Sequence, residues 1–331
     1  MKKSLAVLLS GAMLMLAACG GGGNQASGEK KEKTVKIGIT QIVEHPSLDA
    51  AREGFIAALK DAGYEEGKNL KIDYQNAQGD MNNNASIAQK FVSDKSDLIL
   101  AIATPSAQAA VQATKDIPVL FTAITDPVGA ELVQSMEKPG GNTTGTSDTH
   151  PDAIKNTIAA IKKFIPGAKK VGIIYNNGEP NSVVNVKNAK EALQAEGLEA
   201  VESTISASSE VKQAAESMVG RVDVLYIPKD NTVVAALESV ITVANDKDIP
   251  MFVGEGDSVK RGAFASYGLD YHELGYTTGK MAVEILKGKK PADIPVGYPE
   301  NLELVVNKKA AEEQGIKLTN DMLKDAKIVG E

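Results

Sequence analysis

The chain has 331 residues, and its composition limits the kinds of partner it can have. Its net charge is −7, and residues 34–331 alone carry −10, because residues 1–33 hold five lysines and two glutamates. A surface this acidic disfavours nucleic acid as a partner, since phosphate contacts need lysine and arginine. The three histidines are far apart in the sequence and have no metal-ligand spacing. We therefore expect no nucleic acid, no metal and no cofactor.

The first residues have the pattern of a secretory signal. Two lysines precede an apolar run over residues 5–16, and these roughly 12 residues are too few to span a bilayer. The run ends in Leu16-Ala17-Ala18-Cys19, which resembles the lipobox of bacterial lipoproteins, and Cys19 is the only cysteine of the chain. The alternative is a plain cleaved signal with an incidental cysteine. We expect a signal peptide at 1–18, then a lipidated Cys19 and a flexible Gly-rich linker at 19–33.

Strands and helices are predicted to alternate from residue 35 onward. Apolar runs predict strands at 35–40, 70–76, 98–103, 119–124, 171–175, 200–205, 224–227 and 251–253. Helical patterns fall between them, at 48–59, 87–91, 104–114, 182–196, 209–219 and 233–245. This alternation predicts parallel sheets with helices on both faces.

One order of elements occurs twice. Asp97 opens a strand that is followed by a polar turn, a helix, Lys-Asp-Ile-Pro at 115–118 and another strand. Asp223 opens the same order, with Lys-Asp-Ile-Pro at 247–250. We interpret the two blocks as two similar lobes with a boundary near residues 146–150.

The C-terminal part predicts further crossings between the lobes. A helix begins at Tyr271, a Pro-rich passage covers 291–299, and a last strand covers 302–306. We expect an α/β fold of two Rossmann-like lobes with parallel sheets, joined by a multi-strand hinge. The first lobe would hold 34–147 plus 272–295, and the second would hold 148–271 plus 296–331. Such a hinge lets a cleft close on a ligand.

The carboxyl ends of the predicted strands are polar, and ligands of parallel sheets bind beyond those ends. Prolines in the first turns of the following helices leave free N–H groups that attract an anion, such as a ligand carboxylate near Thr104 and Ser106. Asp230 or Glu255 could then bind an ammonium group. The alternative is that these residues are only helix caps and turns. The candidate ligand-binding residues are Thr40, Gln41, His45, Thr104, Ser106, Thr125, Asp126, Tyr175, Asn176, Asn177, Asp230, Asn231 and Glu255.

Several of these residues lie in stretches that resemble a known family. The stretches are 38–46, 103–108, 125–128, 142–145, 175–176, 179–182 and 230–231. They are similar to the extracytoplasmic substrate-binding lipoproteins of ABC transporters, in the branch that serves tryptophan and tyrosine. The resemblance implies a type I periplasmic-binding fold, hinge closure, and delivery of an amino acid, with an aromatic one favoured, to a permease with a cytoplasmic ATPase. It also implies a monomer outside the cytoplasm, anchored to the cell membrane by an N-terminal lipid.

The side-chain pocket is less defined, because the chain has no tryptophan. Phe121, Tyr175 and Tyr267 are candidates for stacking on an aromatic ligand, although residues of this kind more often belong to the core of the sheet. Two alternatives stay open, a sugar or nucleoside binder of the same fold and a sensory lipoprotein that does not transport. We do not expect an enzyme, since the sequence has no Gly-x-Ser-x-Gly elbow and its one cysteine is assigned to the lipid.

Overall fold

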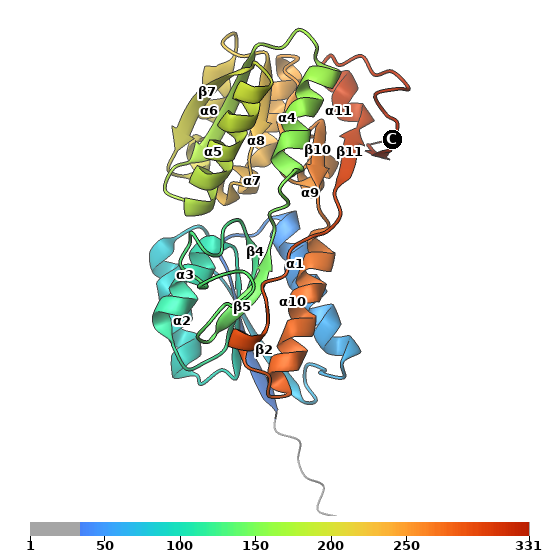
Figure 1. Cartoon of the computed structure of the whole chain (residues 1–331). Helices are drawn as coiled ribbons and strands as arrows, with labels where there is room; N and C mark the ends of the chain where they lie inside the picture. Colours follow the sequence, from blue (N-terminus) through green and yellow to red (C-terminus); the bar gives the residue numbers. More distant parts are fainter. Residues whose placement is uncertain (1–33, 331) are drawn as a thin grey trace, which may run out of the picture. The chain divides into compact units, whose positions relative to one another are not determined.

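The computed structural model describes residues 34–330, in which two β-sheets, each covered by helices on both faces, form two lobes (Figure 1). The predicted signal peptide, Cys19 and the linker lie outside the described residues. Within the described part, no helix combines the length and the apolar character that crossing a membrane requires.

The first lobe is built on a parallel sheet with the strand order β2-β1-β3-β4-β5. The strands are β1 (Val35–Gln41), β2 (Leu70–Asn76), β3 (Leu98–Ile102), β4 (Val119–Ile124) and β5 (Thr143–Ser147). One face is covered by α1 (Pro46–Asp61) and α10 (Tyr271–Leu286), and the other by α2 (Met81–Ser93) and α3 (Thr104–Ala113). β3 and β4 are buried along their whole length, as expected for strands covered on both faces.

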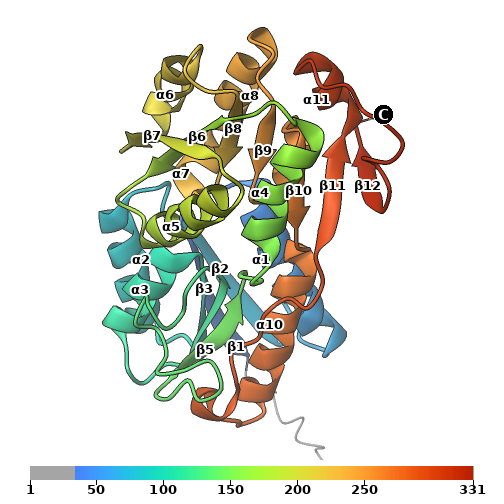
Figure 2. The ribbon, with the colours of Figure 1, turned by 45° about the horizontal axis from the view of Figure 1, so that its top comes forward.

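The second lobe has a longer sheet, with the order β12-β11-β10-β9-β8-β6-β7 (Figure 2). The strands are β6 (Lys170–Asn176), β7 (Glu199–Ile205), β8 (Val224–Ile227), β9 (Met251–Val253), β10 (Ala265–Gly268), β11 (Glu303–Asn307) and β12 (Ala326–Val329). All neighbours are parallel except β10 and β11.

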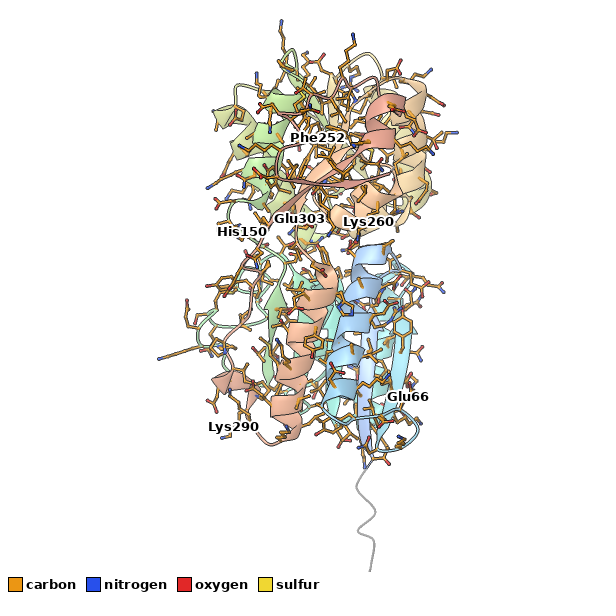
Figure 3. All side chains as sticks on the ribbon, turned by 90° about the vertical axis from the view of Figure 1, so that its right-hand side faces the viewer. Glu66, His150, Phe252, Lys260, Lys290 and Glu303 are labelled. Carbon is orange, nitrogen blue, oxygen red and sulfur yellow. The ribbon has the colours of Figure 1, made fainter. Side chains whose placement is uncertain are left out.

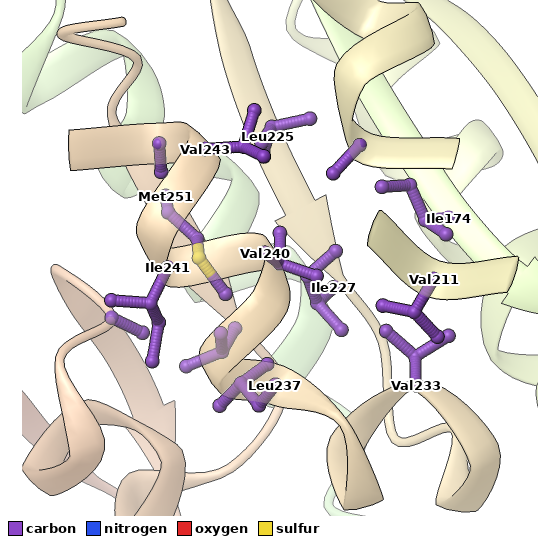
Figure 4. Close-up of a cluster of buried hydrophobic side chains, with 14 of the residues drawn as sticks. Ile174, Val211, Leu225, Ile227, Val233, Leu237, Val240, Ile241, Val243 and Met251 are labelled. Atoms are coloured by element: carbon purple, nitrogen blue, oxygen red, sulfur yellow. The ribbon is translucent and has the colours of Figure 1, made fainter. Parts of the chain in front are cut away.

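Helices cover both faces of this second sheet. On one face lie α4 (Ala153–Phe164), α5 (Pro180–Ala195) and α11 (Lys308–Glu313). On the other lie α6 (Val211–Met218), α7 (Asn231–Ala235), α8 (Leu237–Asp246) and α9 (Gly256–Arg261). The core beneath this second group consists of aliphatic side chains around Leu225, Ile227 and Met251 (Figure 4).

The repeat predicted from the sequence is confirmed by the topology. The order β7-β6-β8-β9-β10 repeats β2-β1-β3-β4-β5 strand for strand. The two aspartates that directly precede β3 and β8 also form equivalent hydrogen bonds. Asp97 Oδ2 accepts a hydrogen bond from the Lys36 amide at 2.9 Å, and Asp223 Oδ2 accepts from the amides of Lys169 and Lys170 at 2.8 Å. Each carboxylate thereby fixes the start of the neighbouring strand.

The chain crosses between the lobes after the fifth strand of each, so α10 follows β10 but packs on the first lobe, against α1 (Figure 3). Glycines allow the two helices to approach closely. A Cβ atom at Gly275 would lie 1.8 Å from the Ala51 carbonyl oxygen, and one at Gly54 would lie 2.0 Å from that of His272. The third crossing follows Gly297, whose backbone bonds to Gly145 and Ser147 at 2.9 and 2.8 Å.

Some elements differ from the sequence predictions. The helix expected over 233–245 is two helices, which meet at Ala236. The elements that were not predicted are β5, α4, α9, β10, α11 and β12. The three strands among them are short or polar and lack a clear apolar run. The amide of Val296 bonds to the carbonyl of Met136 in the first lobe, so that lobe extends past residue 295.

Candidate functional site

All buried carboxylates of residues 34–330 follow the carboxyl end of a strand. Asp148 follows β5, Glu179 follows β6, Asp230 follows β8, and Glu255 follows β9, with exposed fractions of 3, 6, 0 and 4%. In open parallel sheets this is the edge at which ligands bind. The negative charge buried in this protein is therefore concentrated at the cleft between the lobes.

Only one of the four carboxylates has a cationic partner among the described residues. Lys229 Nζ lies 3.1 Å from Asp148 Oδ1, and Tyr271 donates its hydroxyl proton to Asp148 Oδ2 at 2.8 Å. No lysine or arginine between residues 34 and 330 forms an ion pair with Glu179, Asp230 or Glu255. A buried charge without a partner is costly, so this side of the cleft is suited to a cationic group.

Two of the unpaired carboxylates are occupied by hydrogen bonds from the protein. Asp230 caps α7 through the amide of Val233 at 2.8 Å and accepts a second bond from the amide of Asn176 at 2.6 Å. Burial, together with the nearby charge of Glu179, raises the pKa of Asp230 to about 7. Glu179 accepts from the side chains and backbone amides of Asn231 and Thr232.

Glu255 is less occupied. Its hydrogen bonds with the described residues both reach Oε2, from the hydroxyl of Ser47 at 2.7 Å and that of Ser258 at 3.4 Å. Of the two residues predicted to bind an ammonium group, Glu255 therefore has more capacity to accept a further hydrogen bond than Asp230.

Apart from Asp148 Oδ1, which pairs with Lys229, four buried polar side chains on the turns and helix starts that follow the strands have atoms without a hydrogen-bond partner. In the first lobe these are both ring nitrogens of His45, Nδ2 of Asn84 and Oγ1 of Thr104, and in the second lobe Oδ1 of Asn181. Each such atom costs about 1–3 kcal/mol when it stays unpaired. The first-lobe groups can all donate a proton, whereas Asn181 Oδ1 can only accept one.

The helix starts add to the donor character of the first lobe. α1 and α3 begin with a proline in the first turn, and the side chain of neither N-cap residue, His45 or Ala103, caps the helix. Their first N–H groups thus stay free at the positive ends of the helix dipoles. Ala103 has φ 75° and ψ 157°, a conformation that is essentially restricted to glycine. Strain of this kind clusters at binding sites.

Residues of both lobes line a cavity of about 590 Å³ beside α1, α9, α10 and β11, and two further cavities at the carboxyl ends of the strands. The two cavities at the strand ends bear on the predicted site. The larger, about 400 Å³, is bounded in the first lobe by Ile42, Val43, Gln78, Gly79, Met81 and Pro105, and in the second by residues 176–179, 206–208, 231, 232 and 235. The smaller, about 70 Å³, is lined by Thr104 and Asn181 among others, so it receives unpaired atoms from both lobes. Neither cavity is lined by an aromatic side chain.

Most predicted site residues lie at this cleft. Those that are buried at the strand ends are Thr40, Gln41, His45, Thr104, Ser106, Thr125, Asp230, Asn231 and Glu255. Asn176 and Asn177 line the larger cavity, and Asp126 lines the smaller one. Gln41 is engaged elsewhere in its own lobe, where it bonds to Asp49 and Arg52 at 2.9 Å.

The packing of the aromatic residues favours the alternative that they belong to the core of the sheets. Tyr175 donates its hydroxyl proton to Glu202 on β7 at 2.9 Å, and it lines neither cavity. Phe121 is completely buried in the first-lobe core, and Tyr267 packs against the second-lobe core. Phe121 and Tyr267 therefore contribute to the packing of the strands, whereas the role of the half-buried Tyr175 in ligand binding stays a prediction.

The sequence analysis did not assign Ser47, Asn84, Asn181 or Lys229. Asn84 had a detectable signal, because it shares the buried stripe of α2 with Ala88 and Phe91 at helical spacing. A polar side chain in an apolar stripe indicates a buried hydrogen-bonding role. Asn84 Oδ1 accepts from Ser106 at 3.1 Å, and its Nδ2 remains free.

Besides the bond from Lys229 Nζ to the Asp148 carbonyl oxygen at 2.7 Å, beside the hinge, two buried hydrogen bonds join the lobes across the cleft. One is the bond from Ser47 on α1 to Glu255, and the other runs from Asn185 Nδ2 on α5 to Thr125 Oγ1 at 3.1 Å. The predicted ligand residue Thr125 thus makes a contact between lobes.

The chain is similar to proteins of known kind along nearly its whole length. The profile of the family described as ABC transporter substrate binding protein matches residues 36–329. The tyrosine-binding protein of Clostridioides difficile is 49% identical over 313 residues, which cover 92% of this chain and 90% of that protein. Solute-binding proteins with bound 5-methylthioribose or myo-inositol, at 13 and 17% identity and TM-scores of 0.63, share the type I periplasmic-binding fold.

Two solved relatives allow the arrangement of the two lobes in this chain to be compared with a ligand-bound and a ligand-free structure. The Streptococcus pneumonia protein in complex with L-Trp is 38% identical, with a TM-score of 0.85 over 90% of this chain and 100% of that one. A ligand-free, open substrate-binding protein from Clostridium difficile is 46% identical, yet its TM-score is 0.66 over 89 and 99% of the two chains. The lobes are therefore arranged more nearly as in the L-Trp complex than as in the ligand-free, open protein. The chain belongs to the substrate-binding proteins of ABC transporters.

Proposed function

We propose that this protein captures an aromatic amino acid in the cleft between its lobes and passes it to the permease of an ABC importer, without chemical change. The observation that carries this proposal is the opposite polarity of the two sides of the cleft. Unpaired donors and uncapped helix starts gather on the first lobe, whereas unpaired carboxylates gather on the second. A zwitterion satisfies both sides at once.

The carboxylate of the ligand fits the first lobe. Thr104 Oγ1 and Asn84 Nδ2 are buried donors without a partner, and the free N–H groups of α3 begin beside Thr104. Anions bind at such helix starts because N–H groups and the helix dipole both favour negative charge. On the second lobe, Glu255 and Asn181 Oδ1 are buried acceptors that can still take a hydrogen bond, and we assign the ammonium to Glu255 because it carries the charge, although it does not line the two strand-end cavities.

An aromatic side chain fits the apolar part of the larger cavity. This wall is formed by Ile42, Val43, Met81, Pro105 and Ala235, so the ring would contact aliphatic and thioether groups. Methionine makes favourable contacts with aromatic rings through its sulfur. The named ligands of two relatives, tyrosine and tryptophan, support this assignment.

Calorimetry with ligands that lack one charge tests the proposal. We expect L-tryptophan, L-tyrosine or L-phenylalanine to bind residues 34–331, and a ligand at a hundred times its Kd to stabilise the fold by about 2.7 kcal/mol. Tryptamine lacks the carboxylate and indole-3-propionate lacks the ammonium, so each should bind at least tenfold more weakly than tryptophan. Equal binding of tryptophan and both analogues would contradict a two-pole site. Binding of a neutral sugar or nucleoside instead would favour the alternative substrate class.

We also propose that Cys19 carries a lipid that holds the protein at the outer face of the cell membrane. The support is the sequence Leu16-Ala17-Ala18-Cys19 and the absence of any other cysteine. The Cys19→Ala variant should be released from the membrane fraction, while the wild type should remain there and carry the mass of the acyl groups. A wild type without added mass would favour the cleaved signal.

A further inference from the structure

The side chains of Ser47 and Asn185 form hydrogen bonds between the two lobes. Ser47 Oγ donates to Glu255 Oε2 at 2.7 Å, and Asn185 Nδ2 donates to Thr125 Oγ1 at 3.1 Å. All four residues are at least 94% buried. Each bond joins a helix or turn of one lobe to an element of the other, and the donor atoms Ser47 Oγ and Asn185 Nδ2 are both engaged by protein acceptors.

The two bonds lie on different elements, so together they hold the lobes at two separate points. Ser47 is in the first turn of α1 and meets the start of α9, whereas Asn185 is in the middle of α5 and meets the end of β4. Asn185 Nδ2 also bonds to the carbonyl of Asn181 at 2.9 Å, which fixes the amide in the orientation that reaches Thr125. The α5 backbone therefore holds the Asn185 side chain in the orientation that bonds to Thr125.

The comparison with the relatives indicates when these bonds exist. The lobes are arranged more nearly as in the tryptophan-bound relative than as in the open relative, despite the higher identity of the open one. A bond that spans the two lobes breaks when they separate. We propose that Ser47 and Asn185 are closure residues, which stabilise the closed state after the ligand has bound and do not themselves contact it. The inference rests on the proposed function only for the choice of ligand.

The expected effects follow from the two kinds of bond. A neutral hydrogen bond contributes about 0.5–1.5 kcal/mol, which is a factor of about 2–12, and a bond to a charged group contributes about 1.5–3 kcal/mol, a factor of about 12–150. Asn185→Ala should therefore raise the Kd for L-tryptophan about 2- to 12-fold, and Ser47→Ala should raise it more. The change should be in the dissociation rate, because the bonds form after encounter.

The ligand-free protein provides the readout that separates closure from folding. If the bonds exist only in the closed state, both variants should keep the ligand-free Tm of the wild type and show a smaller Tm increase with L-tryptophan. Asn188→Ala, one turn further along α5 and partly exposed, is the matched control and should change neither value. A lower ligand-free Tm in the variants, with unchanged dissociation rates, would assign the two residues a structural role and overturn the proposal.

Lobe closure can be measured directly with spin labels. Residues 34–331 contain no cysteine, so Lys68→Cys in the first lobe and Lys212→Cys in the second accept labels selectively; both side chains are exposed. L-tryptophan should shift the wild type to a short distance and the Ser47→Ala, Asn185→Ala double variant only in part. Full closure of the double variant at equal ligand saturation would refute the proposal. If the wild type failed to bind any aromatic amino acid, the result would count against the proposed function instead. The fraction of closed molecules in variant and wild type could still be compared from their ligand-free distance distributions.

Discussion

Replacing Glu255 by glutamine isolates the charge that is proposed to bind the ligand ammonium. Glutamine keeps the size of the side chain and retains a carbonyl oxygen that can accept the hydrogen bond from Ser47. Only the negative charge is lost. A charge-assisted hydrogen bond contributes about 1.5–3 kcal/mol, so the Kd for L-tryptophan should rise about 12- to 150-fold. Because Glu255 has no cationic partner in the described chain, the ligand-free variant should be at least as stable as the wild type.

The ligand provides the control for this substitution. Indole-3-propionate has no ammonium group, so in Glu255→Gln it should lose only the share of affinity that comes from the weakened bond to Ser47, and tryptophan should lose more; calorimetry can compare both ligands on both proteins. Glu303→Gln, an exposed carboxylate that pairs with Lys327 at 2.9 Å, should leave both affinities unchanged. An equal loss for tryptophan and indole-3-propionate would show that Glu255 acts on closure or folding, and no loss for tryptophan would place the ammonium elsewhere.

Three further predictions concern stability. The pKa of Asp230 is raised to about 7 from 3.8, so the folded state binds a proton that the unfolded state has already released. The free energy of unfolding should therefore fall as the pH rises from about 4 to about 7. In urea titrations, the Asp230→Asn variant should lack this pH-dependent decrease. Gly275→Ala should cost about 1–3 kcal/mol or more, because its Cβ would lie 1.8 Å from the Ala51 carbonyl oxygen; an unchanged Tm would contradict the close helix contact. Ala103→Gly should be neutral or stabilising by up to about 2 kcal/mol, because glycine relieves the backbone strain at this position. The control Ala101→Gly on β3 should destabilise the fold. An equal decrease in Tm for both variants would refute the assigned strain.

The order of the elements could be predicted because apolar runs and helical stripes are local properties of the sequence. β2, β4, β8 and β9 have the predicted limits; β8 and β9 are short apolar runs, β4 is apolar apart from Thr122, and β2 alternates apolar and polar residues. β5, which reads Thr-Thr-Gly-Thr-Ser, was not predicted as a strand, because its burial comes from β4, from α10 and from the returning segment at Gly297. Such contacts join residues more than a hundred positions apart.

The candidate site could be located from the sequence, but the partners of its residues could not. The strand-end rule identified Asp230 and Glu255 as cleft residues, and both are buried there. It could not show that the oxygens of Asp230 are occupied by backbone amides, whereas Glu255 bonds across the cleft to Ser47. It also left open whether Tyr175 stacks on a ligand or packs in the sheet, and it could not show that the Tyr175 hydroxyl bonds to Glu202. Which side chain faces which partner depends on the tertiary arrangement.

The crossings after β5 and β10 mean that each lobe is completed by a helix from the other half of the repeat. α4 comes directly after the first-lobe sheet and packs on the second, and α10 comes directly after β10 and packs on the first. Neither lobe is therefore a contiguous segment that could be excised. A fragment that ends at residue 147 would leave the apolar face of α1 uncovered. The two lobes should therefore fold and unfold as one cooperative unit, although they move as two bodies when the cleft opens.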